Sequence, residues 1–254
     1  MYAPYIRTLN SLCPSEPMHT SDSVIIITGA TGNLGTVTAR AFQATGARTV
    51  LADRSLERLR QAFVELADSP DHFLAAGVDL SEVASLSKLV VEVLSRFGRI
   101  DVLVHTVGAW RGGKPLHETD LADWDFLFNV NLRTTVHCCR AVLPQMLKQG
   151  RGKIITVASR DALAGSAGYA AYSASKSAVL RLNEALADEV KTLGVNVNCI
   201  MPGTIDTAQN RAASPGADFS QWVQPSAIAD VILFFASDAA RAINGAALPV
   251  FGKG

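Results

Sequence analysis

Tyr172 and Lys176 lie four residues apart in the run YSASK, and Ser159 stands thirteen residues before the tyrosine. In a helix this spacing places the phenol and the ammonium on one face, one turn apart. A free tyrosine has a pKa of about 10, and a fixed positive charge one turn away favours its phenolate. Such a tyrosine could take a proton from an alcohol or return one to a ketone, while Ser159 donates a hydrogen bond to the same oxygen. A Tyr and a Lys at this spacing can also be a packed ring beside a solvated charge. The surrounding sequence must therefore decide between the catalytic and the structural interpretation.

A glycine-rich turn near the start of the chain supplies that context. Residues 24–27 read Val-Ile-Ile-Ile, which is typical of a strand buried on both faces. The run TGATGNLG follows, and a helical pattern then continues through Phe42. Glycines let a backbone approach a phosphate, and the free N–H groups of a helix N-terminus face the anion. The alternative is an ordinary strand-to-helix turn, but strand and helix together favour a dinucleotide site at Gly29, Thr31, Gly32, Asn33, Leu34 and Gly35.

Acidic residues follow the next two strand patterns. Asp53 is placed to accept hydrogen bonds from the adenosine ribose hydroxyls, and it would repel a 2′-phosphate. Arg54 could instead pair with such a phosphate, or could begin the next helix on the surface. We give Asp53 more weight because it lies at the strand tip, so NAD(H) is the favoured cofactor and NADP(H) the alternative. Asp79, with Leu80 beside it, could contact the adenine or help to cap the following helix.

Strand and helix patterns alternate along the rest of the chain. Helices are expected at 82–97, 121–148, around YSASK and at 225–236, and strands at 72–78, 102–105, 154–157, 195–200 and 247–250. Seven strands with helical crossovers predict an α/β fold, a Rossmann-like doubly wound parallel sheet with helices on both faces. Ligands bind such sheets beyond the carboxyl ends of the strands. The residues that follow strand ends, and should therefore meet at one edge, are Gly29, Asp53, Asp79, Gly108, Ser159, Pro202 and Gly203.

Composition narrows the functional classes. The 254 residues carry 23 basic and 23 acidic side chains, mixed along the chain, which argues against a nucleic-acid surface. No apolar run reaches the length of a membrane span. The four cysteines fit a reducing compartment, and the neighbours Cys138 and Cys139 are expected in the core, without metal or disulfide. We expect a cytoplasmic protein with a disordered tail at 1–22 and a single domain at 23–254.

Several spaced motifs together resemble the short-chain dehydrogenase/reductase family over about residues 24–251. They are TGATGNLG, Asp79, NVNL at 129–132, Ser159, YSASK and PGTIDT at 202–207. The resemblance implies that Tyr172 is the general acid/base and that Ser159 holds the substrate oxygen. It also implies that Lys176 binds the nicotinamide ribose and tunes Tyr172, while Asn131 anchors a proton-relay water.

The same resemblance extends to the nicotinamide and to assembly. Pro202, Gly203, Ile205 and Thr207 would lie along the nicotinamide and its carboxamide. The two long helices, around 121–148 and 169–192, would join copies of the chain into a tetramer or a dimer.

Two departures from the family pattern concern the cofactor site. The middle glycine of TGxxxGxG lies one place earlier here, so Asn33 occupies the usual glycine position, and asparagine tolerates unusual backbone angles. The run Asn-Asn-Ala-Gly after the fourth strand is replaced by HTVG at 105–108. Gly108 keeps a close backbone approach, and Thr106 could partly replace the bracing asparagine. His105 is expected to be a strand residue with a satisfied ring.

The predicted function is an NAD(P)(H)-dependent oxidoreductase that moves a hydride between the nicotinamide and a carbonyl or secondary alcohol. One alternative is reduction of a pterin, as in dihydropteridine reductases, which residues 210–225 resemble; Ser159 would then be a bystander. Another is a dinucleotide-sensing protein without turnover. The substrate is not predicted. Its pocket is expected behind Gly108, at 160–169 and after Thr207, where Arg111, Arg160 and Arg211 could attract an acid group.

Overall fold

Seven parallel strands form one sheet in the computed structural model, which describes residues 23–253. The strands are β1 (Val24–Thr28), β2 (Arg48–Ala52), β3 (His72–Ala75), β4 (Val102–His105), β5 (Gly152–Val157), β6 (Val195–Pro202) and β7 (Ala247–Val250). Their order across the sheet is β3-β2-β1-β4-β5-β6-β7, and every neighbouring pair is parallel. The predicted doubly wound sheet is confirmed. The tail predicted at 1–22 lies outside the described residues.

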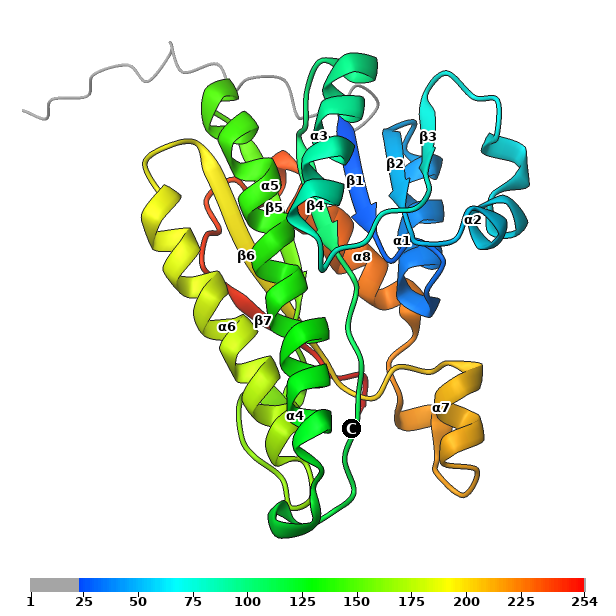
Figure 1. Cartoon of the computed structure of the whole chain (residues 1–254), viewed down its shortest axis with the longest axis vertical. Helices are drawn as coiled ribbons and strands as arrows, with labels where there is room; N and C mark the ends of the chain where they lie inside the picture. Colours follow the sequence, from blue (N-terminus) through cyan, green and yellow to red (C-terminus); the bar gives the residue numbers. More distant parts are fainter. Residues whose placement is uncertain (1–22, 254) are drawn as a thin grey trace, which may run out of the picture.

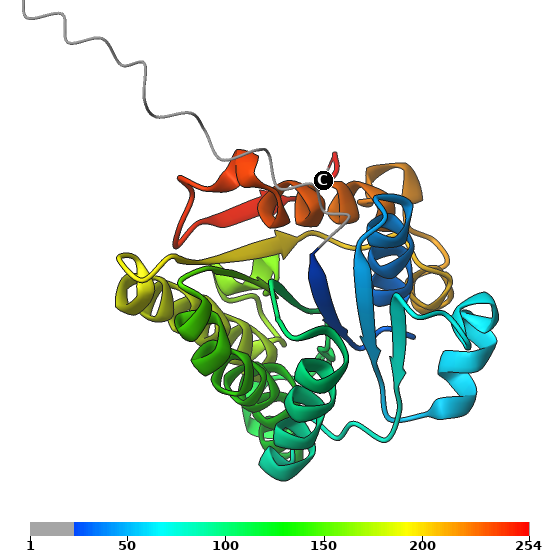
Figure 2. The same ribbon diagram turned by 90° about the horizontal axis from the view of Figure 1, so that it is seen from above.

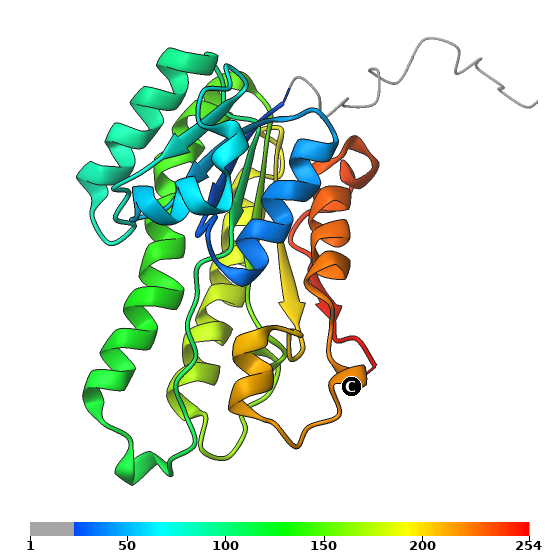
Figure 3. The same cartoon turned by 90° about the vertical axis from the view of Figure 1, so that its right-hand side faces the viewer.

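Helices cover both faces of this sheet (Figure 1). They are α1 (Asn33–Ala44), α2 (Leu56–Ala62), α3 (Val83–Phe97), α4 (Leu121–Leu127), α5 (Thr134–Gln149), α6 (Ala170–Val190), α7 (Ala208–Ala213) and α8 (Pro225–Ala236). Figure 2 and Figure 3 show α3, α5 and α6 on one face and α1 with α8 on the other. Helix α2 follows Arg54, where the sequence offered the surface start of a helix as an alternative, whereas α7 had not been indicated; both are short and largely exposed.

Strand β1 shows why polar residues do not alternate with apolar residues in the buried strands. Val24 and Ile26 pack into the core beneath α3 and α5, whereas Ile25 and Ile27 pack into the core beneath α1 and α8. All four side chains are at most 1% exposed. Burying one such side chain contributes roughly 1.5–3 kcal/mol. A strand covered on both sides therefore needs apolar residues at every position.

The carboxyl ends of the strands share one edge because all strands point the same way. Strands β2 and β3 lie in sequence order on one side of β1, and strands β4 to β7 lie in sequence order on its other side. A ligand crevice is expected at this switch point between β1 and β4. In Figure 1 the loop after β4 and helix α7 extend beyond this edge of the sheet.

Two element boundaries differ from the expectations. The strand predicted to reach residue 78 ends at Ala75, because Gly77 turns the chain with a φ of 70°. The single helix predicted at 121–148 is interrupted by a π-helical segment, Phe128–Arg133. The hydroxyls of Thr134 and Thr135 donate to backbone oxygens of that segment, each at 2.7 Å. Such π segments occur often at functional sites, and this one carries Asn131.

Candidate active site

The glycine-rich turn forms a close-packed cradle at the end of β1. Gly29 has a φ of 69°, and a Cβ there would lie 2.7 Å from Val107 Cγ2. A Cβ on residue 35 would overlap the Gly29 carbonyl group. Helix α1 starts after Gly32, and no side chain caps it or places an acid in its first turn. The turn thus fits a pyrophosphate, because it brings backbone N–H groups and a positive helix end to one open place.

Asn33 lies at the first position of α1. Among residues 23–253 only glycines have positive φ, so Asn33 does not use the tolerance for unusual backbone angles on which we based its fit. The shift of the middle glycine to residue 32 is accommodated because Gly32 itself becomes the residue that precedes the helix.

Asp53 faces the cradle from the end of β2. Its Oδ2 accepts hydrogen bonds from the Thr31 hydroxyl at 2.6 Å and from the Thr31 N–H at 3.3 Å, and its Oδ1 accepts from the Ser55 N–H at 3.3 Å. The carboxylate is thus held beside the glycine-rich turn, at the position from which we expected it to accept hydrogen bonds from the adenosine ribose hydroxyls. The structure joins Thr31 and Asp53, a pairing that their spacing did not reveal.

Arg54 turns toward Asp79 rather than toward the cradle. Its Nη2 lies 2.9 Å from Asp79 Oδ1, which also accepts from the Ser81 N–H and hydroxyl. Hydrogen bonds from Ser81, with a smaller contribution from Arg54, lower the pKa of Asp79. Asp79 therefore braces the turn that leads to α3, but it does not cap that helix: α3 begins at Val83 after Glu82, and no side chain caps its N-terminus, so the capping alternative was wrong. Leu80 is buried in the core, so its side chain packs rather than facing solvent.

The HTVG turn after β4 is braced without the asparagine. Thr106 donates its hydroxyl proton to the Thr28 carbonyl at 2.8 Å, which confirms its expected replacement role. His105 is 1% exposed, and its Nδ1 and Nε2 lie 2.8 and 3.2 Å from the hydroxyls of Thr28 and Thr134. The satisfied ring is confirmed. Burial, with a contribution from the charge of Lys176, lowers the pKa of His105 to about 3, so the ring is neutral.

Asn131, Gly108 and Lys176 meet at one point above this turn. Asn131 Oδ1 accepts from the Ala109 N–H at 2.8 Å, and its Nδ2 donates to the Ala109 carbonyl at 3.1 Å and to Ser175 Oγ at 3.0 Å. A Cβ on residue 108 would lie 2.9 Å from Lys176 Nζ and 3.2 Å from Asn131 Oδ1. The asparagine side chain thus fixes the loop after β4 against helix α6, and only glycine leaves room for the lysine.

Lys176 is buried and Tyr172 is half-buried on α6. Lys176 Nζ donates to the Val157 carbonyl at 3.0 Å, and burial lowers its pKa to about 8. Burial raises the pKa of Tyr172; a hydrogen bond with Ser159 opposes this shift, and the charge of Asp161 adds to it. The pKa of Tyr172 thus moves in the opposite direction to the one predicted from the charge of Lys176, because loss of water around the phenol is the largest influence on it.

Ser159 follows β5 and contacts a residue that the sequence patterns did not single out. Its Oγ donates to Asp161 Oδ2 at 3.0 Å and accepts from the Asp161 N–H at 3.2 Å. The only signal in the sequence is an acid two residues after the serine, in a turn. Asp161 lies close enough to Tyr172 for its charge to affect the phenol.

The segment from Pro202 to Thr207 leaves β6 along the same edge. A Cβ on residue 203 would lie 3.0 Å from the Phe251 carbonyl oxygen, so Gly203 permits a close backbone approach. Ile205 pairs with Val223 in an isolated bridge. Thr207 caps α7 by accepting from the Asn210 N–H at 3.1 Å.

The arginines considered as acid-binding groups are engaged elsewhere. Arg211 pairs with Asp206 through two nitrogens, at 2.5 and 2.6 Å. Hydrogen bonds from Arg211 and Gln224 lower the pKa of Asp206 to about 2. Arg111 pairs with Asp123 at 2.6 Å, and Arg160 lies over the Phe251 ring. Two of the three guanidinium groups thus already have a carboxylate partner.

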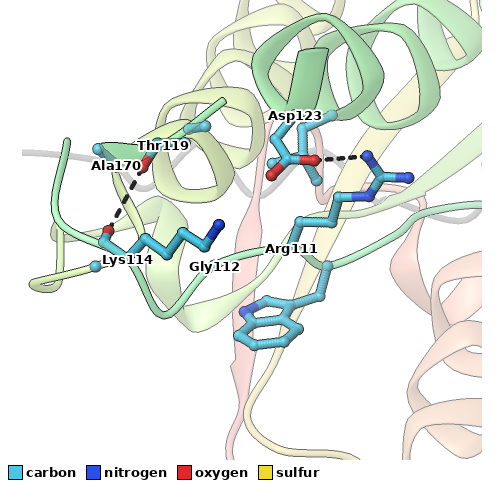
Figure 4. A pocket seen from close by; sticks show the side chains of 10 residues that line it. Arg111, Gly112, Lys114, Thr119, Asp123 and Ala170 are labelled. Atoms are coloured by element: carbon cyan, nitrogen blue, oxygen red, sulfur yellow. Dashed lines mark hydrogen bonds and ion pairs between the residues drawn. The ribbon is translucent and has the colours of Figure 1, made fainter. Parts of the chain in front are cut away.

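A cavity of about 260 Å³ lies between the loop after β4 and the start of α6 (Figure 4). Its walls include Arg111, Lys114, Asp123 and Ala170, and the Arg111–Asp123 pair is visible at its rim. Neither Ser159 nor Tyr172 lines it. We therefore place the chemistry at the strand ends rather than in this cavity, because the proton-transfer groups are there.

Neither a metal-binding cluster nor a membrane-spanning helix is found within residues 23–253. Those residues hold no group of three or more histidine, cysteine, aspartate or glutamate side chains arranged to bind a metal ion. In the same part of the chain, no helix combines the length and the apolar character needed to cross a membrane. Cys138 and Cys139 are buried in the core, which confirms their expected position.

Comparisons with known proteins agree with this geometry. The short chain dehydrogenase family model matches residues 23–218. The (2S)-[(R)-hydroxy(phenyl)methyl]succinyl-CoA dehydrogenase subunit of Thauera aromatica is 34% identical over 92% of this chain and 97% of its own. Meso-2,3-butanediol dehydrogenase of Serratia marcescens is 33% identical over 92% and 95%. A solved gluconate 5-dehydrogenase of Burkholderia cenocepacia, in complex with NADP and tartrate, is 30% identical with a TM-score of 0.83, covering 91% of this chain and 94% of that one. The chain thus belongs to the short-chain dehydrogenase/reductase family, whose enzymes interconvert alcohol and carbonyl groups.

Proposed function

We propose that this protein oxidises secondary alcohols, or reduces the corresponding carbonyls, with Tyr172 as general acid/base and NAD(H) favoured over NADP(H). The observation that carries the proposal is the meeting of Asn131, Gly108 and Lys176 directly beside the cradle at the end of β1. Proton-transfer groups and a dinucleotide site thereby share one sheet edge. A sensor without turnover would have no need of the former.

Each residue has a defined task in this proposal. The bound dinucleotide supplies the hydride acceptor or donor. In alcohol oxidation Tyr172 takes the hydroxyl proton, and in carbonyl reduction it returns one. Lys176 is held by the Val157 carbonyl at 3.0 Å, where its protonated form can donate to ribose hydroxyls and to the phenol. Asn131 fixes the backbone at Ala109, and the relay water assigned to it stays a prediction.

The cofactor preference rests on Asp53 and Arg54. Asp53 is oriented by Thr31 and Ser55 at the cradle, where it favours two ribose hydroxyls over a 2′-phosphate. Arg54 would have to leave Asp79 to bind such a phosphate. Pro202, Gly203, Ile205 and Thr207 are proposed to line the nicotinamide end, since they follow the end of β6 at the same edge.

Assembly through the long helices is proposed as well. Leu121 is 78% exposed and Phe126 is 36% exposed on α4, so this end of the helix pair offers apolar surface. A homodimer or homotetramer would cover it. A cytoplasmic location remains a prediction.

The test of the proposed function is the variant Tyr172→Phe, with Tyr5→Phe as the control, because Tyr5 precedes the domain predicted at 23–254. Turnover with NADH or NADPH should fall by about 100-fold or more in Tyr172→Phe, the contribution of a general acid/base, whereas Tyr5→Phe should keep it. Calorimetric titration should find dinucleotide binding within about threefold of the parent in both variants, because neither hydroxyl is needed for the cradle. Comparable turnover in Tyr172→Phe would refute the mechanism.

A second variant separates the pterin alternative. If the substrate oxygen is held by Ser159, Ser159→Ala should lower kcat for alcohols and carbonyls by about tenfold or more. An unchanged rate with a quinonoid pterin as the acceptor would instead assign the serine a bystander role.

A further inference from the structure

Asp161 is held rigidly beside the proposed catalytic pair. It lies in the single turn Arg160–Ala162, directly after Ser159. The turn is fixed to its surroundings from both sides: the Ala162 N–H donates to the Ser159 carbonyl at 3.0 Å, and Ser177 of α6 donates to the Ala162 carbonyl at 2.9 Å. Asp161 itself is half-buried. Its carboxylate is therefore preorganised at the substrate end of the site.

Ser159 cannot serve Asp161 and a substrate at the same time. A serine hydroxyl has one proton, and here that proton is donated to Asp161 Oδ2, since a carboxylate only accepts. Tyr172, the other hydrogen-bonding partner of Ser159, has a raised pKa and can donate its own proton to the serine oxygen. To donate to the reacting oxygen of a substrate, Ser159 must rotate away from Asp161. The carboxylate then loses a donor in a partly dry place, which costs free energy unless a replacement arrives.

A substrate hydroxyl is the natural replacement. Within residues 23–253 Asp161 forms no ion pair, and its side chain accepts only from Ser159. Of the three arginines of the expected pocket walls, Arg111 and Arg211 are paired with Asp123 and Asp206, and Arg160 lies over the Phe251 ring. The carboxylate of Asp161 thus has no cationic partner, so it disfavours an anionic group beside it and accepts hydrogen bonds from donors.

We propose that Asp161 selects substrates that carry a second hydroxyl group on the carbon next to the reacting one, that is, vicinal diols and polyols. The second hydroxyl donates to Asp161 and releases Ser159 to hold the reacting oxygen. The inference rests on the proposed function and specifies its substrate class. In the reaction the reacting carbon gives up a hydride to the oxidised dinucleotide and its oxygen gives up a proton to Tyr172. The C–O bond becomes C=O, and the second hydroxyl leaves unchanged, as part of a hydroxy ketone.

The test compares matched substrates in the full-length protein. The pairs are butane-2,3-diol with butan-2-ol and cyclohexane-1,2-diol with cyclohexanol, and 3-hydroxybutanoate is the anionic probe. For the parent protein kcat/KM should be at least about tenfold higher for each diol than for its mono-alcohol, the effect of one hydrogen bond to a charged group. The hydroxy acid should be the poorest substrate of the panel.

Asp161→Ala should lower kcat/KM for the diol of each pair but not for its mono-alcohol. The diol loses its partner, so its KM rises, while the mono-alcohol gains a free Ser159, so its kcat/KM is unchanged or higher. A merely structural role of Asp161 would lower both together. Asp161→Asn, which removes only the charge, should raise kcat/KM for 3-hydroxybutanoate. Asp188→Asn is the control, because Asp188 is an exposed acid on the same helix as Tyr172, roughly 24 Å away at 1.5 Å per residue.

The outcomes distinguish this inference from the proposed function. A parent preference for mono-alcohols or for the hydroxy acid overturns the role of Asp161, as does a diol preference that survives Asp161→Ala. Turnover of other ketones or alcohols without turnover of any diol also overturns it. Absence of all NAD(P)(H)-linked turnover fails the proposed function instead.

Discussion

Adding one methyl group at Gly108 should disable catalysis while leaving the fold intact. In Gly108→Ala the new Cβ would lie 2.9 Å from Lys176 Nζ and 3.2 Å from Asn131 Oδ1. Ordinary contacts of this kind are longer by about half an ångström, so the flexible end of Lys176 must move. Its hydrogen bond to the Val157 carbonyl, now 3.0 Å, would then stretch beyond a useful length.

The magnitude follows from that one hydrogen bond. A hydrogen bond to a charged group contributes about 1.5–3 kcal/mol, which corresponds to about a 10- to 150-fold fall in kcat/KM if the loss falls on the transition state. Because a side-chain end and not backbone is displaced, the folded protein loses no more than that one bond, so Tm should fall by at most about 3–12 °C. Gly165→Ala is the control, since a Cβ there meets nothing within 4 Å.

Steady-state kinetics with the best substrate of the panel and a thermal melt measure both quantities. A kcat/KM within threefold of the parent would refute the reasoning about Lys176. A large fall in Tm together with the loss of activity would mean that Gly108→Ala damages the fold, and would refute the claim that the lysine absorbs the methyl group.

Three further predictions concern the same edge of the sheet. Carbonyl reduction needs both Tyr172 and Lys176 in their protonated forms. Because burial raises the pKa of Tyr172 and lowers that of Lys176 to about 8, kcat/KM for reduction should be constant from pH 6 to 7 and fall above about pH 8. A kcat/KM that still rises at pH 9 would contradict this prediction. Gly35→Ala places a methyl group against the Gly29 carbonyl, so the free energy of unfolding should fall by about 3 kcal/mol and Tm by about 6–12 °C. An unchanged Tm would contradict the geometry of the cradle. Asp53→Asn removes the charge that repels a 2′-phosphate, so calorimetry should show the ratio of NADPH to NADH affinity rising by about tenfold, whereas a constant ratio would mean that Asp53 does not read the ribose.

The positions of the site residues could be predicted because they depend on topology. Once the strands alternate with helices, parallel order follows, and every residue after a strand end must lie at one edge. Gly29, Asp53 and Ser159 are placed by this rule alone. The π segment around Asn131 could not be predicted, because it depends on which carbonyl each N–H meets within an otherwise continuous helical pattern.

Electrostatics was the part that the sequence predicted least well. The i, i+4 spacing correctly places Tyr172 and Lys176 on one helix, but it carries no information about how much water each group loses. Burial turns out to be the largest influence on both pKa values. Asp161 was missed for a related reason, since an acid in an irregular turn can point anywhere until the turn is fixed by Ser177 and Ser159.

His105 shows how the site tolerates the loss of its usual asparagine. Thr134 donates its own proton to the Val130 carbonyl at 2.7 Å, so at His105 it can only accept, and the ring proton must be on Nε2. Nδ1 then accepts from Thr28 at 2.8 Å. One neutral ring thereby joins the end of β1 to Thr134, the first residue of α5, directly after the π segment that carries Asn131. Burial, with a contribution from the charge of Lys176, lowers the pKa of His105 to about 3, so the ring can bridge the two hydroxyls in its neutral form.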